Sequence, residues 1–254
     1  MTADQNASSP GADPRATRFA ELVAPAVSRT FVSGMRPDDR LRSVVRTHCG
    51  SAVGYLIDLR NPLAAGRPIS RNDLADLYRY ADPAEIDATI ARSIGHGLLV
   101  ETDAMFRTTA AGRDFLHDLF QVQGVVLAER WGSVAHVVRA LNELLGAVLR
   151  KAEESAGPAF TIHAPPYEPS GAPAELVLLN RLSTLRYHRA DAHASAWQAA
   201  GMTAAQVAAE PWGTAWSERR RQVEHHTNVL AGRPFAVLDG DQRLQLLAGL
   251  AALP

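Results

Sequence analysis

The chain has 254 residues, of which 46% are hydrophobic and 21% are charged. These values are close to those of globular domains and exclude disorder as the dominant state. Lys and Arg together number 26 against 27 Asp and Glu, so any contact with nucleic acid depends on a local basic patch. A single cysteine, Cys49, excludes an intrachain disulfide. No segment offers the roughly 20 apolar residues of a membrane span, and the polar start lacks the core of a secretory signal. The sequence therefore predicts a cytoplasmic protein without a membrane partner.

The N-terminal quarter is predicted to contain a tail followed by helices. Residues 1–14 are rich in Ala, Ser, Pro, Gly and Asp, and we expect a disordered tail there. Residues 15–66 form a predicted N-terminal helical segment, with one helix around 19–27 and another over 38–59. Pro25 lies within the first helix, where a kink or a break is expected.

Residues 67–116 have the clearest local signals. Ser70 and Asp73 have the spacing of an N-cap pair, which predicts a helix over 71–80. Asp82 and Pro83 predict the start of a second helix, with Glu85 at the capping-box position. That helix is expected to end near Gly95 or Gly97. Two short strands, 98–101 and 105–108, follow and are joined by a tight turn over 102–104.

Two helices joined by a short turn and followed by a hairpin predict a winged helix-turn-helix. The segment ISRNDLADLYRYADPAEIDATIARSIGHGLLVETDAMFRTTAAGRDFL resembles the winged-helix module of MarR-like regulators. This resemblance implies that the second helix reads DNA and that the hairpin is the wing. The DNA contacts it implies are Arg71, Arg79, Arg92 and Arg107.

The charge of this segment argues against strong DNA binding. Between Ile69 and Phe115 there are five Arg but eight Asp or Glu. Glu85 and Asp87 lie near the start of the second helix, where bases and phosphates would be met. Duplex DNA repels carboxylates at that position, and phosphate binding depends on Lys and Arg. Duplex DNA is therefore only one possible partner.

Residues 117–254 are predicted to form a helical domain that binds a ligand and builds a homodimer. A long helix over 110–154 has an apolar face wide enough for several packing partners, with interruptions expected at Gly124 and Gly132. A connecting loop is expected over 157–173, because this stretch is rich in Pro and Gly. Helices are then expected over 174–200, 212–230 and 241–253. The predicted fold class is mainly α, with a small hairpin wing and a helical domain.

The segment LRYHRADAH contains the first candidate site. On a helix, His188 and Asp191 are three residues apart and lie near one face. Together with Tyr187 or His193 they could act in acid–base catalysis or anchor a ligand. The alternative is a hydrogen-bond network between helices that partly buries these histidines. A metal is not expected, because this segment supplies only two ligands and a site needs three or four.

The segment QVEHHTNVL contains the second candidate site, His225 and His226 beside Glu224. Pairing of its helix with the first segment would bring four histidines to one polar pocket, with Trp197 as a possible apolar wall. The alternative is a solvated helix face. The predicted ligand-binding residues are Tyr187, His188, Trp197, His225 and His226.

A second resemblance covers residues 180–254. LRYHRADAH, an Ala-rich helix ending at Gly201, E-x-x-T-N-x-L-A and a Leu-rich terminal helix resemble a largely uncharacterised bacterial helix-turn-helix family. Members of that family carry a leucine-like residue at the position of His188 and no histidine pair before Thr227. The resemblance therefore supports the fold and says little about activity.

Three functional hypotheses follow from the sequence. The first is a ligand-responsive winged-helix transcriptional regulator, with a small hydrophobic molecule held between the helical domain and the winged helix. The second is an enzyme of small-molecule or secondary metabolism, on a winged-helix scaffold that has lost DNA binding and with His188, Asp191 and His193 in acid–base chemistry. The third is a non-catalytic interaction module. No cofactor is expected under any of them.

Overall fold

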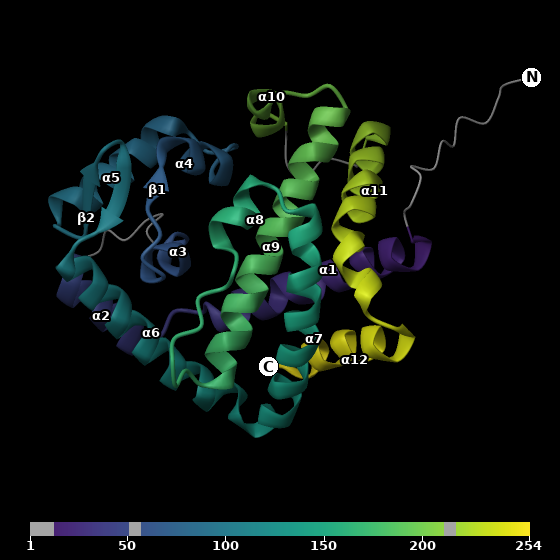
Figure 1. Ribbon diagram of the computed structural model, residues 1–254, viewed down its shortest axis with the longest axis horizontal. Coiled ribbons are helices and arrows are strands. Elements are labelled where there is room, and N and C mark those ends of the chain that lie inside the picture. Colours follow the sequence, from purple (N-terminus) through teal and green to yellow (C-terminus); the bar gives the residue numbers. More distant parts are fainter. Residues whose placement is uncertain (1–12, 51–56, 211–216) are drawn as a thin grey trace, which may run out of the picture.

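The computed structural model describes residues 13–50, 57–210 and 217–254 and is mainly helical, with one small antiparallel sheet (Figure 1). The predicted mainly α class is confirmed at this level. The helices are α1 (Pro14–Gly34), α2 (Asp39–Cys49), α3 (Arg60–Ala64), α4 (Arg71–Leu77), α5 (Pro83–Gly95), α6 (Ala110–Trp131), α7 (Ala135–Ala152), α8 (Pro158–His163), α9 (Ala174–Ala199), α10 (Ala204–Ala208), α11 (Glu218–Gly232) and α12 (Gly240–Ala252). The strands are β1 (Ile69–Ser70), β2 (Leu99–Thr102) and β3 (Met105–Thr108).

The sheet has the order β1-β3-β2, with both pairs antiparallel. Thr102 pairs with Met105, and the two residues between them, Asp103 and Ala104, have φ values of 53° and 58°. Two consecutive positive φ angles allow a two-residue connection whose twist matches that of the strands. The predicted hairpin is present, and β1 adds a third strand that the sequence did not predict.

The helices beside the sheet begin where the capping residues predicted. Ser70 and Asp73 form a complete capping box at the start of α4. The Asp82 carboxylate accepts from the backbone N–H of Ala84, and Pro83 is the first residue of α5. These elements enclose one hydrophobic core, here called the small-sheet cluster: Cys49, Leu59, Leu63, Ile69, Leu74, Ile86, Ile90, Leu98, Leu99, Phe106, Phe115, Leu116 and Leu119.

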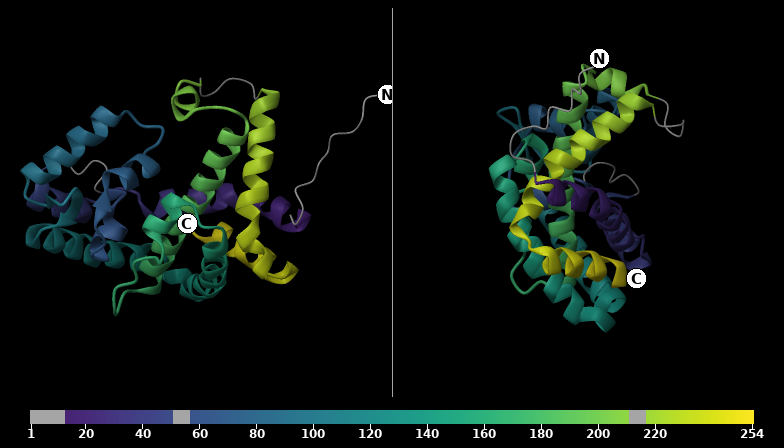
Figure 2. Two further views of the ribbon diagram at one scale, coloured as in Figure 1. Left: turned by 45° about the horizontal axis from the view of Figure 1, so that its top comes forward. Right: turned by 90° about the vertical axis from the view of Figure 1, so that its right-hand side faces the viewer.

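A second core, here called the helical cluster, is formed by α1, the second half of α6, α7, α8, α9, α12 and the 3₁₀ turn η4 (Arg233–Val237). Its largest members include Phe19, Phe120, Leu127, Trp131, Leu145, Phe160, Leu179, Leu182, Phe235 and Leu246. Helix α9 crosses the middle of this body, with α7, α11 and α1 packed around it (Figures 1 and 2).

The predicted N-terminal segment 15–66 is divided between the two clusters. Helix α1 packs in the helical cluster, whereas α2 and α3 pack beside the sheet. Helix α1 is unbroken through Pro25, because that residue lies on the exposed face. There the carbonyl that loses its intrahelical donor can bond to water.

Several predicted boundaries differ from the structure. Helix α6 passes through Gly124 without interruption and ends at a short 3₁₀ turn that begins at Gly132. The predicted loop 157–173 contains α8, which begins at Pro158. Most of the predicted tail, and the part of the predicted 212–230 helix before 217, lie outside the described residues. Among the described helices, none is long and apolar enough to cross a lipid bilayer.

Candidate functional site

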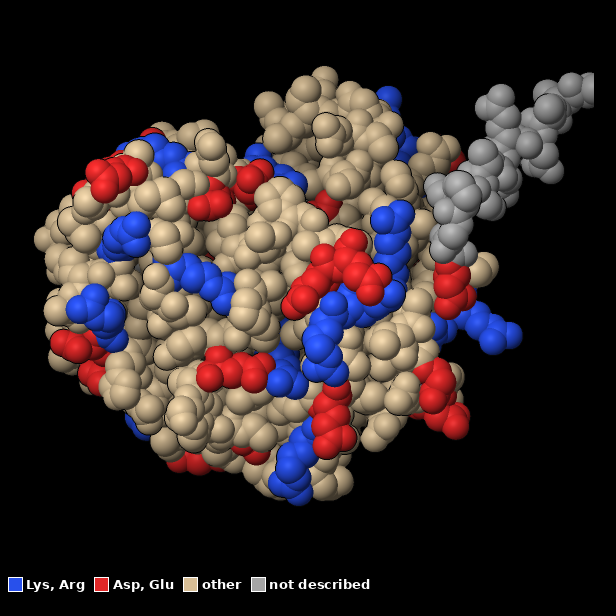
Figure 3. All heavy atoms as spheres, viewed as in Figure 1, with Lys and Arg blue, Asp and Glu red and all other residues tan. Residues whose placement is uncertain are grey.

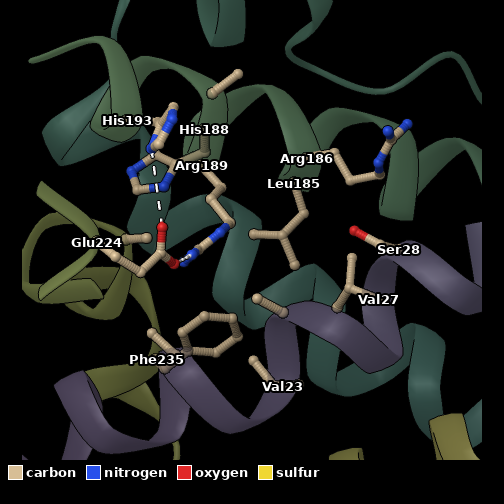
Figure 4. A pocket seen from close by; sticks show the side chains of 14 residues that line it. Val23, Val27, Ser28, Leu185, Arg186, His188, Arg189, His193, Glu224 and Phe235 are labelled. Atoms are coloured by element: carbon tan, nitrogen blue, oxygen red, sulfur yellow. Dashed lines mark hydrogen bonds and ion pairs between the residues drawn. The ribbon is translucent and has the colours of Figure 1, made fainter. Parts of the chain in front are cut away.

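A cavity of about 300 Å³ lies between α1, α9, α11 and η4 (Figure 4). We call it the central cavity. Its apolar wall comes from α1, the end of α11 and η4, and its polar wall comes from α9 and Glu224. The lining residues are Ala20, Val23, Ala24, Val27, Ser28, Leu185, Arg186, His188, Arg189, Ala190, His193, Glu224, Ala231 and Phe235. An apolar surface facing a few polar groups is the usual composition of a small-molecule site.

At one end of the polar wall, an ion pair and a hydrogen bond connect α9 to α11. Arg189 forms an ion pair with Glu224 and donates to Asn228 Oδ1 at 2.8 Å. Both members of the ion pair are partly buried, with about 29% and 28% of their side chains exposed. The network fixes the spacing of α9 and α11 and neutralises Glu224.

His193 lies beside this network with both ring nitrogens occupied. Trp197 Nε1–H donates to His193 Nε2 at 2.9 Å, so a neutral ring carries its proton on Nδ1. Nδ1 lies 3.1 Å from the Oγ1 of Thr227, whose hydroxyl donates to the carbonyl of Val223. Burial is the main cause that lowers the pKa of His193. The imidazole is therefore a neutral wall group with no free lone pair for proton transfer.

His188 is more deeply buried, with 3% of its surface exposed. Its Nε2 lies 3.0 Å from Ser155 Oγ, and its ring meets that of Phe160 edge to face. Burial, followed by the charge of Arg233, lowers the pKa of His188 to about 4. His188 is therefore uncharged at neutral pH.

Arg186 marks the opposite end of the cavity from Glu224 (Figure 4). Its guanidinium lies over the ring of Phe31, 4.1 Å from the ring centroid, which is a cation–π geometry. Burial is the largest influence on the pKa of Arg186 and lowers it, while the charge of Asp58 acts in the opposite direction.

Asp191 lies on the other side of α9 from the central cavity, and both oxygens of its carboxylate are engaged in hydrogen bonds within the chain. Its Oδ1 accepts from Arg79 Nη2 at 2.9 Å and from the backbone N–H of Ala159 at 3.2 Å. Its Oδ2 accepts from the backbone N–H of Phe160 at 2.8 Å. Gly157 packs so closely that a Cβ there would lie 2.5 Å from the Asp191 side chain. Asp191 thus caps α8 and ties α9 to Arg79, two residues after the end of α4.

Trp197 also faces away from the central cavity. It lines a cleft of about 500 Å³ between the end of α4, α8, α9 and α10, here called the α4–α9 cleft, together with Arg79, Tyr80 and Asp191. Trp197 belongs to a small apolar cluster, against which Tyr80 packs. The charges of Arg79 and Asp191 in this cleft neutralise each other.

Tyr187 takes part in a buried polar group that the sequence did not predict. Its ring stacks on His163 at 3.6 Å between centroids, and burial raises its pKa. The His163 ring lies between the carbonyls of Ala159 and Asp58. Burial lowers the pKa of His163 to about 4. Tyr187 therefore packs inside the body and does not line the central cavity.

Arg60 joins this buried group from α3. Its guanidinium is 2% exposed and makes one hydrogen bond, of 3.4 Å, to the carbonyl of Ile57. Its Nε and Nη2 have no hydrogen-bond partner. Burial lowers the pKa of Arg60 to about 10. The only sign of this burial in the sequence is that Arg60 lies near the apolar residues Leu59 and Leu63. An arginine on the surface of an amphipathic helix has the same neighbours, so the sequence does not reveal the burial.

The four predicted histidines do not converge. His188 and His193 line the central cavity, whereas His225 is exposed and His226 is half-buried on α11, and neither lines that cavity. Within the described ranges, no group of three or more His, Cys, Asp or Glu has the arrangement of a metal site. The idea of one pocket built from four imidazoles is therefore wrong, because His225 and His226 lie outside the cavity that His188 and His193 line.

The arginines predicted to contact DNA fall into two kinds. Arg79 pairs with Asp191, and Arg71 pairs with Asp87 and Glu101 while lying over the Phe106 ring. Arg92 and Arg107 are exposed, and Arg92 donates a hydrogen bond to Thr89 Oγ1. Two of the four side chains are therefore already neutralised by carboxylates of the same chain.

The sequence analysis placed Glu224 with the predicted polar pocket but did not identify Arg186 and Arg189 as wall residues of the cavity. All three were visible within or beside the two histidine segments, and Arg189 and Glu224 have the opposite charges of an interhelical pair. No family model, no curated protein and no solved structure matches the chain.

Proposed function

We propose that the protein is a ligand-responsive regulator built on a winged-helix module, with a small molecule bound in the central cavity. This proposal depends on one observation: α9 lines the central cavity with one side and contacts the segment after α4 with the other. One side lines the cavity through His188, Arg189 and His193. The other side holds Asp191 against Arg79, next to α4. A ligand that shifts α9 would act directly on this contact.

The arrangement around the sheet supports the winged-helix part of the proposal. Helices α4 and α5 are joined by the short segment 78–82 and followed by the β2–β3 hairpin, which is the order of a winged helix-turn-helix. Strand β1 pairs with β3 and closes the sheet against the start of α4. In such modules the second helix, here α5, reads DNA.

Helix α8 supplies a second mechanical link between the cavity and this module. Asp191 caps its N-terminus through two backbone N–H groups. At its other end, Arg67 donates to the carbonyls of Ile162, Ala164 and Pro165. Since Arg67 lies two residues before β1 and Asp191 belongs to α9, movement of α9 would reach the module through both ends of α8.

The surface charge limits the strength of any DNA contact. Acidic and basic side chains are interspersed over the face seen in Figure 3, without a broad basic surface. The exposed start of α5 carries Glu85 and Asp87. We therefore assign the DNA contacts to Arg92 and Arg107, and we expect weak binding that depends strongly on salt.

A gel-shift experiment with the DNA upstream of the protein's own coding sequence tests the output. Wild-type protein should shift this fragment at low salt, and Arg92→Ala and Arg107→Ala should each weaken the shift. Arg139→Ala on the exposed surface of α7 is the matched control, because it removes the same charge far from α5. Absence of any shift at low salt would remove DNA from the proposal.

A ligand screen by thermal denaturation tests the cavity itself, with neutral, anionic and cationic amphipathic compounds. Compounds that raise the Tm of the wild-type protein should lose this effect in Ala24→Phe, which fills the lined cavity from α1. Val32→Phe is the control, because Val32 lies on the same helix and is 60% exposed. Equal Tm shifts in both variants would contradict ligand binding at this site.

We do not propose catalysis. The candidate acid–base atoms of His193 and Asp191 are used in hydrogen bonds within the chain. His188 uses one nitrogen on Ser155 and is held neutral by burial. A general base needs a free lone pair within reach of its substrate. The predicted homodimer stays a prediction, which light scattering can check.

A further inference from the structure

We propose that the ligand of the central cavity is an amphipathic anion, with a carboxylate-like group at Arg186 and an apolar body along α1. This inference rests on the proposed ligand-binding function and adds the chemical class of the ligand. It follows from the charges around the cavity, from the burial of Arg186 and from the position of the apolar wall.

The two arginines of the cavity wall are in different electrostatic states. Arg186 and Arg189 are three residues apart on α9 and are therefore neighbours on its surface. Arg189 is neutralised by its ion pair with Glu224. Arg186 lies over Phe31, and within the described ranges no carboxylate approaches it within ion-pair distance. The cavity thus presents a cation without a direct counterion.

Arg233 adds to this positive balance, because its charge opposes a proton on the ring of His188. At His193 the charges are mixed: Glu224 favours a proton on the ring, and Arg189 and Arg220 oppose it. Asp58 is the carboxylate whose charge acts on Arg186, and it also acts on the buried Arg60. One carboxylate shared between two guanidinium groups leaves the region with excess positive charge.

Burial makes this excess charge specific for an anion. A half-buried guanidinium such as that of Arg186, which lies over an aromatic ring, keeps unused N–H donors, and pairing with a carboxylate restores the stabilisation lost on partial burial. Arg is the side chain best suited to this task, because its planar fork matches a carboxylate. A neutral ligand would leave Arg186 without a counterion, and a cationic ligand would repel it.

The apolar wall defines the rest of the ligand. In Figure 4, Val23 and Val27 from α1, Phe235 from η4 and Leu185 from α9 lie between the Arg186 end and the Glu224 end. A volume of about 300 Å³ is at the low end for small-molecule sites. The ligand is therefore small, with a short chain or a single ring.

Calorimetric titration with octanoate, octanol and octylamine tests the inference, because the three compounds share one apolar chain. Octanoate should bind about tenfold more tightly than octanol, as one charge-assisted hydrogen-bonded pair predicts. Octylamine should bind more weakly than octanol. Raising the NaCl concentration should weaken octanoate binding and leave octanol binding nearly unchanged. Equal binding of octanol or octylamine, or no saturable octanoate binding, would overturn the inference.

Variants locate the effect at Arg186. Arg186→Gln should abolish the preference for octanoate over octanol, and Arg186→Lys should keep part of it. Arg139→Gln is the control, because it changes the net charge by the same amount on the exposed surface of α7. If Arg186→Gln does not fold, Arg186→Lys and the salt dependence of octanoate binding to the wild-type protein still test whether Arg186 binds the carboxylate. An unchanged preference in Arg186→Gln would contradict the assignment.

The failure of this inference can be told apart from the failure of the proposed function. If Ala24→Phe blocks the binding of a neutral or cationic compound in the screen, the cavity is a ligand site and only the charge class is wrong. If no compound depends on the cavity, ligand binding itself is disproved.

Discussion

The small-sheet cluster and the helical cluster differ in where they place their charged groups. Beside the sheet, Arg71 pairs with Asp87 and Glu101 at the surface, and its side chain is 57% exposed. In the helical body, Asp191 is 7% exposed and pairs with Arg79 across the boundary between the two clusters. The exposed charges of the first arrangement can be solvated by water if their ion pairs break. The buried carboxylate of the second has no such alternative and depends on its protein partners. The polar chemistry of this protein therefore lies inside and beside the helical body, and not on the face expected to read DNA.

The largest loss of stability is expected when the buried contact between Asp191 and Arg79 is broken. Asp191→Ala leaves Arg79 without its partner and removes the acceptor of two backbone N–H groups of α8. We expect a loss of about 3–5 kcal/mol in the free energy of unfolding, as for removal of one member of a buried pair. Urea denaturation followed by circular dichroism measures it.

Arg71→Ala is the matched surface variant for that experiment. We expect it to cost at most about 1 kcal/mol, because exposed ion pairs contribute little to stability. Similar losses in the two variants would show that the two regions do not differ as described.

The second effect concerns pH and the buried imidazoles. Burial lowers the pKa of His188 and of His163 to about 4, against about 6.5 in an unfolded chain. Between these values the unfolded chain binds more protons, so stability is complete above pH 6.5 and falls as the pH drops to 4. Each histidine contributes a loss of about 3 kcal/mol over this range.

Urea denaturation at pH 7 and at pH 4.5 measures this loss. His188→Gln should reduce the difference between the two pH values, while His225→Gln, at an exposed position on α11, should leave it unchanged. An unaltered pH dependence in His188→Gln would mean that this ring does not stay neutral in the folded protein.

The smallest effect is expected when a glycine in each cluster is replaced by alanine, which adds one methyl group. A Cβ at Gly112 would lie 2.1 Å from the carbonyl oxygen of Leu98, and backbone cannot give way easily. At Gly34 the nearest atom is Leu179 Cδ1 at 2.6 Å, the end of a flexible side chain. We expect Gly112→Ala to cost about 1–3 kcal/mol and Gly34→Ala to cost less.

Thermal denaturation ranks these glycine variants. Gly132→Ala is the control, since a Cβ there meets no atom within 4 Å. A larger cost at Gly34 than at Gly112 would contradict this comparison of rigid and adaptable packing.

Local signals in the sequence predicted much of the small-sheet region. Ser70 with Asp73, Asp82 with Pro83, and the turn at Asp103 act over a few residues, so their spacing alone indicates their structure. Strand β1 has only two residues and is formed by pairing with β3, which leaves no local periodicity. Helix α8 was missed because Asp191, far away in sequence, caps a segment that otherwise has the composition of a loop.

The candidate site was predicted only in part, because its roles depend on contacts distant in sequence. The segment around His188 and His193 does line the cavity, but the hydrogen-bond partners of His193 come from both α9 and α11. Arg79 was expected at DNA, and its actual partner is 112 residues away. Charge and helix position cannot tell an exposed arginine from one whose counterion arrives with the tertiary fold.

The packing of α1 against α12 has a consequence for synthesis of the protein. Thr30 donates to the carbonyl of Leu250, and Ser33 donates to the carbonyl of Pro254, contacts that span more than 200 residues. On the ribosome, the apolar side of α1 therefore emerges long before α12, while the residues around the sheet already have their partners. We expect the nascent chain to close its sheet region first and to need protection of α1, by a chaperone or by transient contacts, until α12 has been synthesised.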